Sequence, residues 1–266
     1  MPDALSKTDA LHVRISGALA TLTLNRPDLH NAIDGQLAGN LAQAFQKIGV
    51  ADMIRVVVIE AKGASFCAGF DLAWLGRTVD QDPAEIQRDA AQLAMMFDAI
   101  DRCPKPVIAM VQGAALGGGA GLVAAADIAI ASEESSFALS EVRLGLAPSI
   151  VAPYLAAAIG SRACRRYMMT GERFDSREAL RLGLIHGTVA PDKLDAARDH
   201  LVDACLKGGP KAQSAVKDLI RVIDDSPMGP DLMRYAATHF SDLRLSDEGR
   251  EGLAAFMEKR KPGWSA

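Results

Sequence analysis

The sequence has few of the residues from which metal sites and disulfide frameworks are built. Its 266 residues include only four cysteines, and none of them forms a C-x-x-C pair. A disulfide framework or a zinc site is therefore not expected. The five histidines do not show the spacing of metal ligands either. These observations favour reduced thiols and no bound metal.

Long apolar runs and an excess of positive charge are also missing. The longest apolar, glycine-rich stretch, 111–126, is interrupted by Gln112 and is too short to span a bilayer. The first residues, Met1–Ala4, carry no signal-peptide pattern. A net charge of −4 makes a nucleic-acid backbone or an anionic membrane a poor partner. We therefore expect a cytoplasmic protein with no nucleic-acid or membrane partner.

What the chain does contain is an alternation of short apolar runs with helical patterns. The near-continuous apolar runs predict strands buried on both faces. A hairpin is expected to precede them, and two amphipathic helices lie between them. The predicted strands are 12–15, 20–24, 55–61, 107–111 and 127–132, and the helices are 36–48 and 85–101. This order predicts an α/β domain with parallel pairing.

After about Ser161 the pattern becomes helical. Asp175–Glu178 has the form of a capping box, which predicts a helix that ends at Gly183. A further helix is expected over 192–206, and three more follow the break at 208–210. We place a domain boundary near residue 200, which gives units 1–200 and 201–266. The second unit is too small to have much core of its own and is expected to pack on the first or on another subunit.

Two glycine-rich segments follow predicted strands. Small residues in Gly63–Asp71 allow a backbone N–H group to approach a ligand, although an ordinary strand-to-helix turn has the same composition. Gly117–Gly119 stand at the start of a helix, where unpaired N–H groups suit a developing oxyanion. A tight turn with close helix packing would explain this second segment as well.

A single acid stands in the third notable segment, Phe137–Pro148. Glu141 lies among mostly apolar residues, and such surroundings tend to raise a carboxyl pKa into the range useful for general acid–base catalysis. A buried ion pair with Arg143 is the structural alternative.

Together and in this order, with Asn25-Arg-Pro-x-x-x-Asn-Ala32 near the start, these segments resemble the crotonase (enoyl-CoA hydratase/isomerase) family over essentially the whole chain. The resemblance implies an α/β fold, a spiral of ββα units over 1–200 that holds the coenzyme A and acyl sites. It also implies a helical region over 201–266 that packs a homotrimer, often as a dimer of trimers. The substrate would be an acyl-CoA thioester, with coenzyme A as part of the substrate and no separate cofactor.

The resemblance also assigns roles to residues. The backbone amides of Ala68 and Gly118 would form an oxyanion hole for the thioester oxygen, and Glu141 would be the catalytic acid/base. His30 could instead be a solvated turn histidine. The positions that match coenzyme A-contacting segments are Leu29, His30, Lys62, Ala64, Ser65, Phe66, Ala68, Gly69, Phe70 and Asp71.

One departure from the family pattern concerns the second catalytic glutamate. The motif Gly-Gly-Gly-x-Glu reads Gly117-Gly-Gly-Ala-Gly121 here, so Gly121 stands at the glutamate position. A single carboxylate suffices to carry a proton from C2 to C4 in an isomerase. It could also serve both steps of a hydration if water is otherwise oriented. We expect a side chain at position 121 to point into the pocket of Glu141.

Three segments, 66–74, 111–123 and 140–148, look like the bacterial methylglutaconyl-CoA hydratase subgroup, whose members act on branched acyl-CoAs in leucine and related isoprenoid catabolism. This favours hydration of a branched α,β-unsaturated acyl-CoA, with a Δ3,Δ2-enoyl-CoA isomerase as the alternative. Phe70 and Ser149–Pro153 are expected to reshape the acyl pocket. Ser149 could orient water or cap a helix.

Two other classes of protein share features with this sequence. Gly119-x-Gly121-x-x-Ala124 between two strands imitates a dinucleotide-binding fingerprint, but too few residues separate it from the next strand for a complete unit. A non-catalytic scaffold or RNA-binding member of the same fold is the second. The retained Glu141 argues against the scaffold, and the acidic charge argues against RNA. No G-x-S-x-G nucleophile motif is present.

Overall fold

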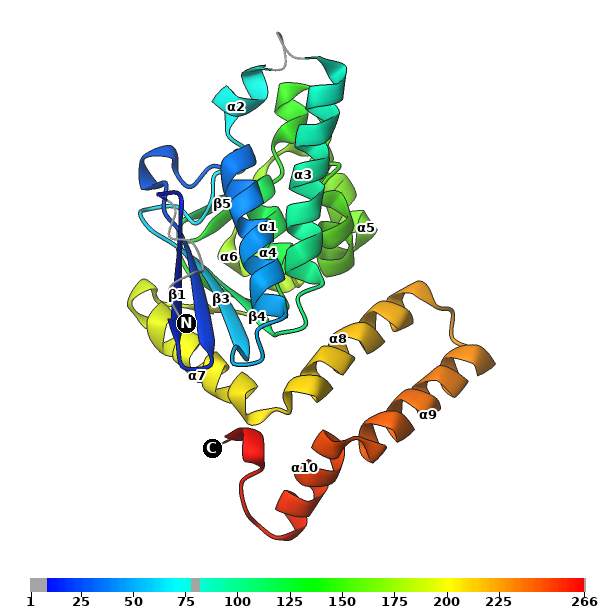
Figure 1. Cartoon of the computed structure of the whole chain (residues 1–266). Coiled ribbons are helices and arrows are strands. Elements are labelled where there is room, and N and C mark those ends of the chain that lie inside the picture. Colours follow the sequence, from blue (N-terminus) through cyan, green and yellow to red (C-terminus); the bar gives the residue numbers. More distant parts are fainter. Residues whose placement is uncertain (1–8, 78–81, 266) are drawn as a thin grey trace.

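The computed structural model describes residues 9–77 and 82–265, and within them the strands form two sheets (Figure 1). Met1–Ala4 lie outside the described residues. The main sheet has the strand order β1-β2-β3-β4-β6-β9, with a β1/β2 hairpin followed by parallel pairs. Its strands are β1 (Leu11–Ser16), β2 (Leu19–Leu24), β3 (Val56–Ala61), β4 (Val107–Val111), β6 (Ile128–Ser132) and β9 (Gly187–Val189).

The second sheet is small and stands beside the ends of the main sheet's strands. In it β7 pairs in parallel with β5 and antiparallel with β8. Its strands are β5 (Ala114–Leu116), β7 (Ser136–Ala138) and β8 (Arg173–Asp175). Since β5 follows β4 after two residues and leads directly into the glycine loop, this sheet fixes where the loop lies.

Both faces of the main sheet are covered by helices. Along β3, Val57 and Ile59 belong to the large core, whereas Val56 and Val58 face a smaller cluster that includes Val202. This alternation is the period of two that a strand requires. The helices of the large core are α1 (Gly35–Gly49), α3 (Pro83–Asp101), α4 (Gly118–Ala125), α5 (Ala152–Thr170) and α6 (Ser176–Leu182). The other face is covered by α7 (Leu194–Lys207).

The predicted α/β order and parallel pairing are confirmed, and the predicted hairpin, strands and helices agree with the structure to within a few residues. The predicted capping box at α6 is half formed. Asp175 Oδ1 accepts a hydrogen bond of 2.8 Å from the Glu178 N–H, and Gly183 ends the helix in the left-handed conformation. The Glu178 carboxylate, however, accepts hydrogen bonds from Tyr167 and Arg181. It therefore ties α6 to α5.

The last three helices extend away from the sheets (Figure 1). They are α8 (Pro210–Asp225), α9 (Pro230–Leu245) and α10 (Asp247–Met257). Large apolar side chains are exposed along them, among them Ile220, Phe240 and Phe256. The predicted boundary at residue 200 lies inside α7, which packs on the main sheet. The division into 1–200 and 201–266 stays a prediction.

We predict that Asp175→Ala lowers the free energy of unfolding by about 1 kcal/mol, because the first turn of α6 loses its side-chain acceptor. Urea unfolding would measure the change. Asp192→Ala is the control, since this exposed carboxylate pairs only with Lys193 on the surface. Equal effects of the two variants would contradict the assigned cap.

Candidate active site

A cavity of about 330 Å³ lies between α2 (Leu72–Gly76), α3, the start of α4 and the chain from Ser140 to Ile150. Its wall is mainly apolar, with Leu72, Leu75, Ile86, Leu93, Leu144 and Leu146. The polar side chains in the wall are those of Asp89, Ser140, Glu141 and Ser149. An apolar cavity with a few polar groups is the usual form of a small-molecule site.

Glu141 is the most unusual of these groups. It opens a short 3₁₀ helix, η3 (Glu141–Leu144), is only 8% exposed, and neither carboxylate oxygen has a hydrogen-bond partner among the described residues. Burial raises the pKa of the carboxyl, and its own backbone amide opposes the shift only in part. The alternative of an ion pair with Arg143 is not seen. A buried, unpaired carboxyl with a raised pKa is suited to proton transfer.

The glycine loop fits closely around this carboxylate. Gly117 has φ 48°, and a Cβ there would lie 2.7 Å from Glu141 Oε1. Its N–H donates to Ala138 O at 2.8 Å, which attaches the loop to the small sheet. The first bond within α4 runs from the Gly121 N–H to Gly117 O, so the N–H groups of Gly118 and Gly119 have no backbone acceptor. The predicted amide donor Gly118 therefore follows the cavity-lining Gly117, and its N–H has no acceptor among the described residues.

The structure contradicts the prediction that Ala68 is the second amide donor beside Gly118. The Ala68 N–H donates to His30 O at 2.9 Å, so it is not available to a thioester oxygen. Phe70 forms an isolated parallel bridge with Ile33, which bonds to Gly69 O and to the Asp71 N–H. In such a bridge Ile33 makes both hydrogen bonds, and the N–H of Phe70 points away from Ile33.

Phe70 therefore replaces Ala68 as the second candidate donor. Its ring lies over Gly118, where a Cβ would come within 2.9 Å of Cε1. The preceding residue, Gly69, has φ 99°, and a Cβ there would lie 3.5 Å from the Gly118 nitrogen. The N–H of Phe70 has no partner among the described residues. The amides of Phe70 and Gly118 are thus the pair that can bind an oxyanion together.

The predicted coenzyme A-contacting residues differ in exposure: Ser65, Phe66 and Gly69 are buried, and Ala68, Phe70 and Asp71 are partly buried. The exposed residues are Leu29, His30, Lys62 and Ala64. His30 Nδ1 lies 3.1 Å from Ser65 Oγ, so the two segments are joined by a polar contact. His30 is nevertheless exposed, and its contact with coenzyme A stays a prediction. Phe66 is fully buried in the large core, so the predicted contact cannot involve its side chain.

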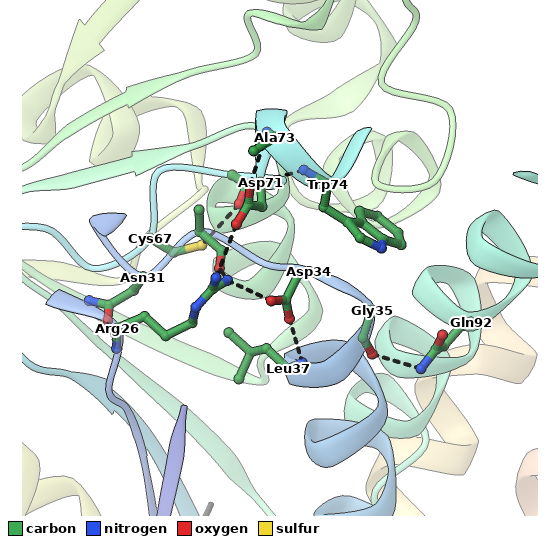
Figure 2. A network of polar contacts seen from close by, with 12 residues as sticks. Arg26, Asn31, Asp34, Gly35, Leu37, Cys67, Asp71, Ala73, Trp74 and Gln92 are labelled. Atoms are coloured by element: carbon green, nitrogen blue, oxygen red, sulfur yellow. Dashed lines mark hydrogen bonds and ion pairs between the residues drawn. The ribbon is translucent and has the colours of Figure 1, made fainter. Parts of the chain in front are cut away.

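Asp71 was predicted to contact coenzyme A, but its carboxylate has a structural role. Figure 2 shows it between Arg26 and the start of α2. One oxygen accepts hydrogen bonds from the N–H groups of Ala73 and Trp74, and the other lies 3.0 Å from Arg26 Nη2. Although burial raises the pKa of Asp71, the bonds from Trp74 and Arg26 outweigh it, and the net shift is downward. Both carboxylate oxygens are engaged within the fold, and a contact between Asp71 and coenzyme A stays a prediction.

Asn31 joins the loop 62–65 to the same region. It is fully buried, and its amide donates to Lys62 O and Ser65 O at 2.8 Å each. Its carbonyl oxygen accepts the Arg26 N–H at 2.8 Å. The loop 62–65 and the turn 26–31 are therefore one rigid unit, and the exposed residues of the predicted coenzyme A surface belong to it.

The expectation for Gly121 was wrong. A Cβ at this position would lie 2.4 Å from Val151 Cγ1 and 3.0 Å from Phe97 Cε1, and neither residue lines the cavity. A side chain there would enter the contact between α4 and α5 instead of the pocket of Glu141. Close helix packing, one of the two explanations considered for these glycines, accounts for Gly121.

The pocket residues expected near the acyl group are partly confirmed. Phe70, Ser149 and Ile150 line the cavity. Ser149 does not cap α5, because that helix begins at Ala152 after Val151 and has no side-chain cap. Asp89 was missed. Its position on the helical face shared by Ile86 and Leu93 was the signal that could have found it.

The same residues do not form the other kinds of site that the sequence made conceivable. Within 9–77 and 82–265, no three His, Cys, Asp or Glu side chains are grouped so that they could hold a metal ion. Over the same ranges no helix is both long and apolar enough to cross a membrane. The dinucleotide-binding alternative finds no support, since α4, which contains Gly118, Gly119 and Gly121, has only eight residues in all before the chain enters β6.

Comparisons with known proteins agree with this geometry. Residues 14–266 match the family model described as enoyl-CoA hydratase/isomerase. A carnitinyl-CoA dehydratase from Proteus mirabilis is 33% identical over 263 residues, which are 97% of this chain and 98% of that protein. A trans-2-decenoyl-[acyl-carrier-protein] isomerase from Streptococcus mutans is 30% identical over 253 residues, 93% of this chain and 95% of that protein.

Among solved structures, an enoyl-CoA hydratase from Shewanella pealeana superposes with a TM-score of 0.93 at 39% identity. The match covers 99% of this chain and 97% of that one. The agreement extends over the helical C-terminal region as well as over the two sheets.

We predict that Gly121→Ala destabilises the protein by about 1–3 kcal/mol, because the new methyl group overpacks the contact with Val151 and Phe97. Gly76→Ala in α2 is the matched control, since nothing lies within 4 Å of its Cβ position. Thermal unfolding of both variants would show the difference. A Gly121→Ala protein as stable as the Gly76→Ala control would show that position 121 has room for a side chain.

Proposed function

The chain belongs to the enoyl-CoA hydratase/isomerase family, and we propose that it adds water to the double bond of a branched α,β-unsaturated acyl-CoA. The main support for this proposal is the Glu141 carboxylate, which is buried without a hydrogen-bond partner among the described residues. It lies beside the glycine loop that contains the Gly118 amide. The subgroup resemblance suggests a methylglutaconyl-like acyl group. The proposal includes no separate cofactor, because the activating groups are the chain's own amides and carboxylate.

In this reaction the thioester oxygen accepts hydrogen bonds from the amides of Phe70 and Gly118, which stabilise the enolate. Each such donor typically contributes roughly 3–4 kcal/mol to the transition state. Ionised Glu141 takes a proton from water as the water oxygen bonds to C3. Glu141 then returns that proton to C2 of the enolate, and the net change is addition of one water molecule. The Ser149 hydroxyl in the cavity wall is placed to orient the water.

The coenzyme A portion is proposed to lie along the rigid unit formed by the turn 26–31 and the loop 62–65. Lys62 is exposed there and could pair with a phosphate, while Leu29 offers apolar surface. This arrangement leaves the acyl group to enter the cavity.

Isomerisation is the second candidate, because this reaction needs only one carboxylate. Glu141 is the single carboxylate beside the oxyanion amides in the described structure, and the position of the second family acid is closed by Val151. A single carboxylate can move a proton from C2 to C4. The relative from Streptococcus mutans carries the name of an isomerase.

Mass spectrometry separates the two reactions. Purified protein is incubated in ¹⁸O-labelled water with branched and straight Δ2- and Δ3-enoyl-CoAs. Uptake of one labelled water molecule supports hydration. A product of unchanged mass but altered retention, formed from a Δ3 substrate, would contradict hydration and support isomerisation. No product from any substrate would contradict both.

Glu141→Gln should lower turnover by about 100- to 10,000-fold, because the acid/base group is removed. The same variant should be more stable than wild type at pH 7–8. Burial raises the folded-state pKa of Glu141, so the wild type loses stability as the pH rises through that value, and the neutral amide does not.

The stability difference should disappear below the pKa of glutamate in the unfolded chain, about 4.3. Thermal melts from pH 4 to 8 with parallel rate assays would measure both effects. The exposed Glu134→Gln is the control. A variant that is inactive and also less stable than wild type at every pH would show a structural role for Glu141.

The homotrimer or dimer of trimers implied by the family is part of this proposal. The exposed apolar side chains of α8, α9 and α10 would be covered by subunit contacts. We predict a trimeric or hexameric mass by light scattering at micromolar concentration. A monomeric mass would contradict the assembly.

A further inference from the structure

The ionisable side chains that line the cavity are both acidic. They are Glu141 and Asp89, and no Lys, Arg or His is among the described lining residues. Asp89 lies on α3 with Ile86, Ala90 and Leu93, which also face the cavity. Its carboxylate is partly buried and has no ion-pair partner in the described residues. The acyl site therefore contains two negative groups and no compensating cation.

The cations nearest to Asp89 in the sequence are engaged elsewhere. Arg88 lies 3.9 Å from Glu85 on the exposed side of α3. Arg77 donates to Trp74 O at 3.4 Å and lines a separate groove that includes Asp34. The four residues at 78–81 are Thr, Val, Asp and Gln, which add no positive charge.

Asp89 is too far along α3 to take the place of the missing second acid. Phe97 is the α3 residue that meets the Cβ position of Gly121, at 3.0 Å. Asp89 precedes Phe97 by eight residues, which is about 12 Å along a helix axis at 1.5 Å per residue. The short aspartate side chain cannot span that distance. Asp89 is therefore placed to meet the acyl chain beyond the reacting carbons.

We propose that Asp89 determines the charge selectivity of the acyl site by excluding acyl chains that end in a carboxylate. This rests on the proposed function, in which the acyl group occupies this cavity. A terminal carboxylate would enter an apolar space beside two carboxylates, where like charges repel more strongly than in water. The acyl group is then branched but uncharged. This departs from the carboxylated, methylglutaconyl-like group that the subgroup resemblance suggests.

Binding of two unreactive analogues tests the proposal. Isovaleryl-CoA and 3-methylglutaryl-CoA share a branch at C3 and differ by the terminal carboxylate. Calorimetry should show that wild type binds isovaleryl-CoA about 10- to 100-fold more tightly. Asp89→Asn should reduce this ratio to less than about fivefold, mainly by tighter binding of the carboxylated analogue.

Glu85→Gln is the matched control, because it removes the same charge from α3 at a residue that does not line the cavity. It should leave the ratio of the two affinities at the wild-type value. Equal binding of both analogues by wild type would overturn the proposal. An unchanged ratio in Asp89→Asn, or the same change in Glu85→Gln, would overturn it too.

Turnover of 3-methylcrotonyl-CoA and 3-methylglutaconyl-CoA gives a second readout. Asp89→Asn should raise kcat/KM for the carboxylated substrate through KM. A loss of kcat on the uncharged substrate with a shifted pH profile would instead assign Asp89 to proton transfer and overturn the selectivity role. If no enoyl-CoA is converted, the proposed function fails, while the analogue affinities still decide the role of Asp89.

Discussion

The contact between the Glu141 carboxylate and the backbone of Gly117 is the constraint on which the site depends. The carboxylate occupies the space that a side chain at Gly117 would need, and the positive φ of Gly117 disfavours a side chain there as well. Because the Gly117 N–H is bonded to Ala138 and α4 begins at Gly118, this contact also sets the position of the Gly118 amide. One close approach thus couples the acid/base to the oxyanion donor, at the expense of burying a carboxylate without a partner.

A second network holds the opposite wall of the site. Arg26 reaches Asp34 at the start of α1 and Asp71 at the start of α2 (Figure 2). Asn31 donates hydrogen bonds to the loop 62–65. Charged pairs with side chains only about one-fifth exposed or less are expensive to separate, because each would leave a poorly solvated charge. The network sits next to the Ile33–Phe70 bridge, and the bridge determines which amide faces the cavity. Residues that looked like ligand contacts in the sequence, above all Asp71, therefore shape the site without lining it.

Much of the fold could be predicted from the sequence, because apolar runs such as Val107–Val111 are buried on both faces and leave few other structures open. The burial of Glu141 and the upward shift of its pKa were also predictable from its apolar segment, but that segment left an ion pair with Arg143 open, and the acid/base role came from the family resemblance. The donor at Phe70 was not predictable. The Ala68 amide is engaged by His30 O, and the parallel bridge with Ile33 leaves the Phe70 amide without a partner among the described residues. Periodicity in the sequence does not predict such single contacts. What a side chain at position 121 would meet depends on how α4 packs against Phe97 and Val151, and local sequence does not specify that packing.

The closed space at Gly121 has a consequence for how one carboxylate can support hydration. With Val151 and Phe97 filling that position, a second acid cannot be placed there unless α5 moves. In the proposed hydration, water is therefore oriented by an uncharged group such as Ser149, which lines the cavity, and Glu141 acts first as base and then as acid. A carboxyl whose pKa is raised by burial suits both steps, since it holds a proton more firmly than an exposed glutamate and still releases it to an enolate. The same absence of a second acid leaves Asp89, on the far part of the wall, free to act on the acyl chain instead of on the reaction.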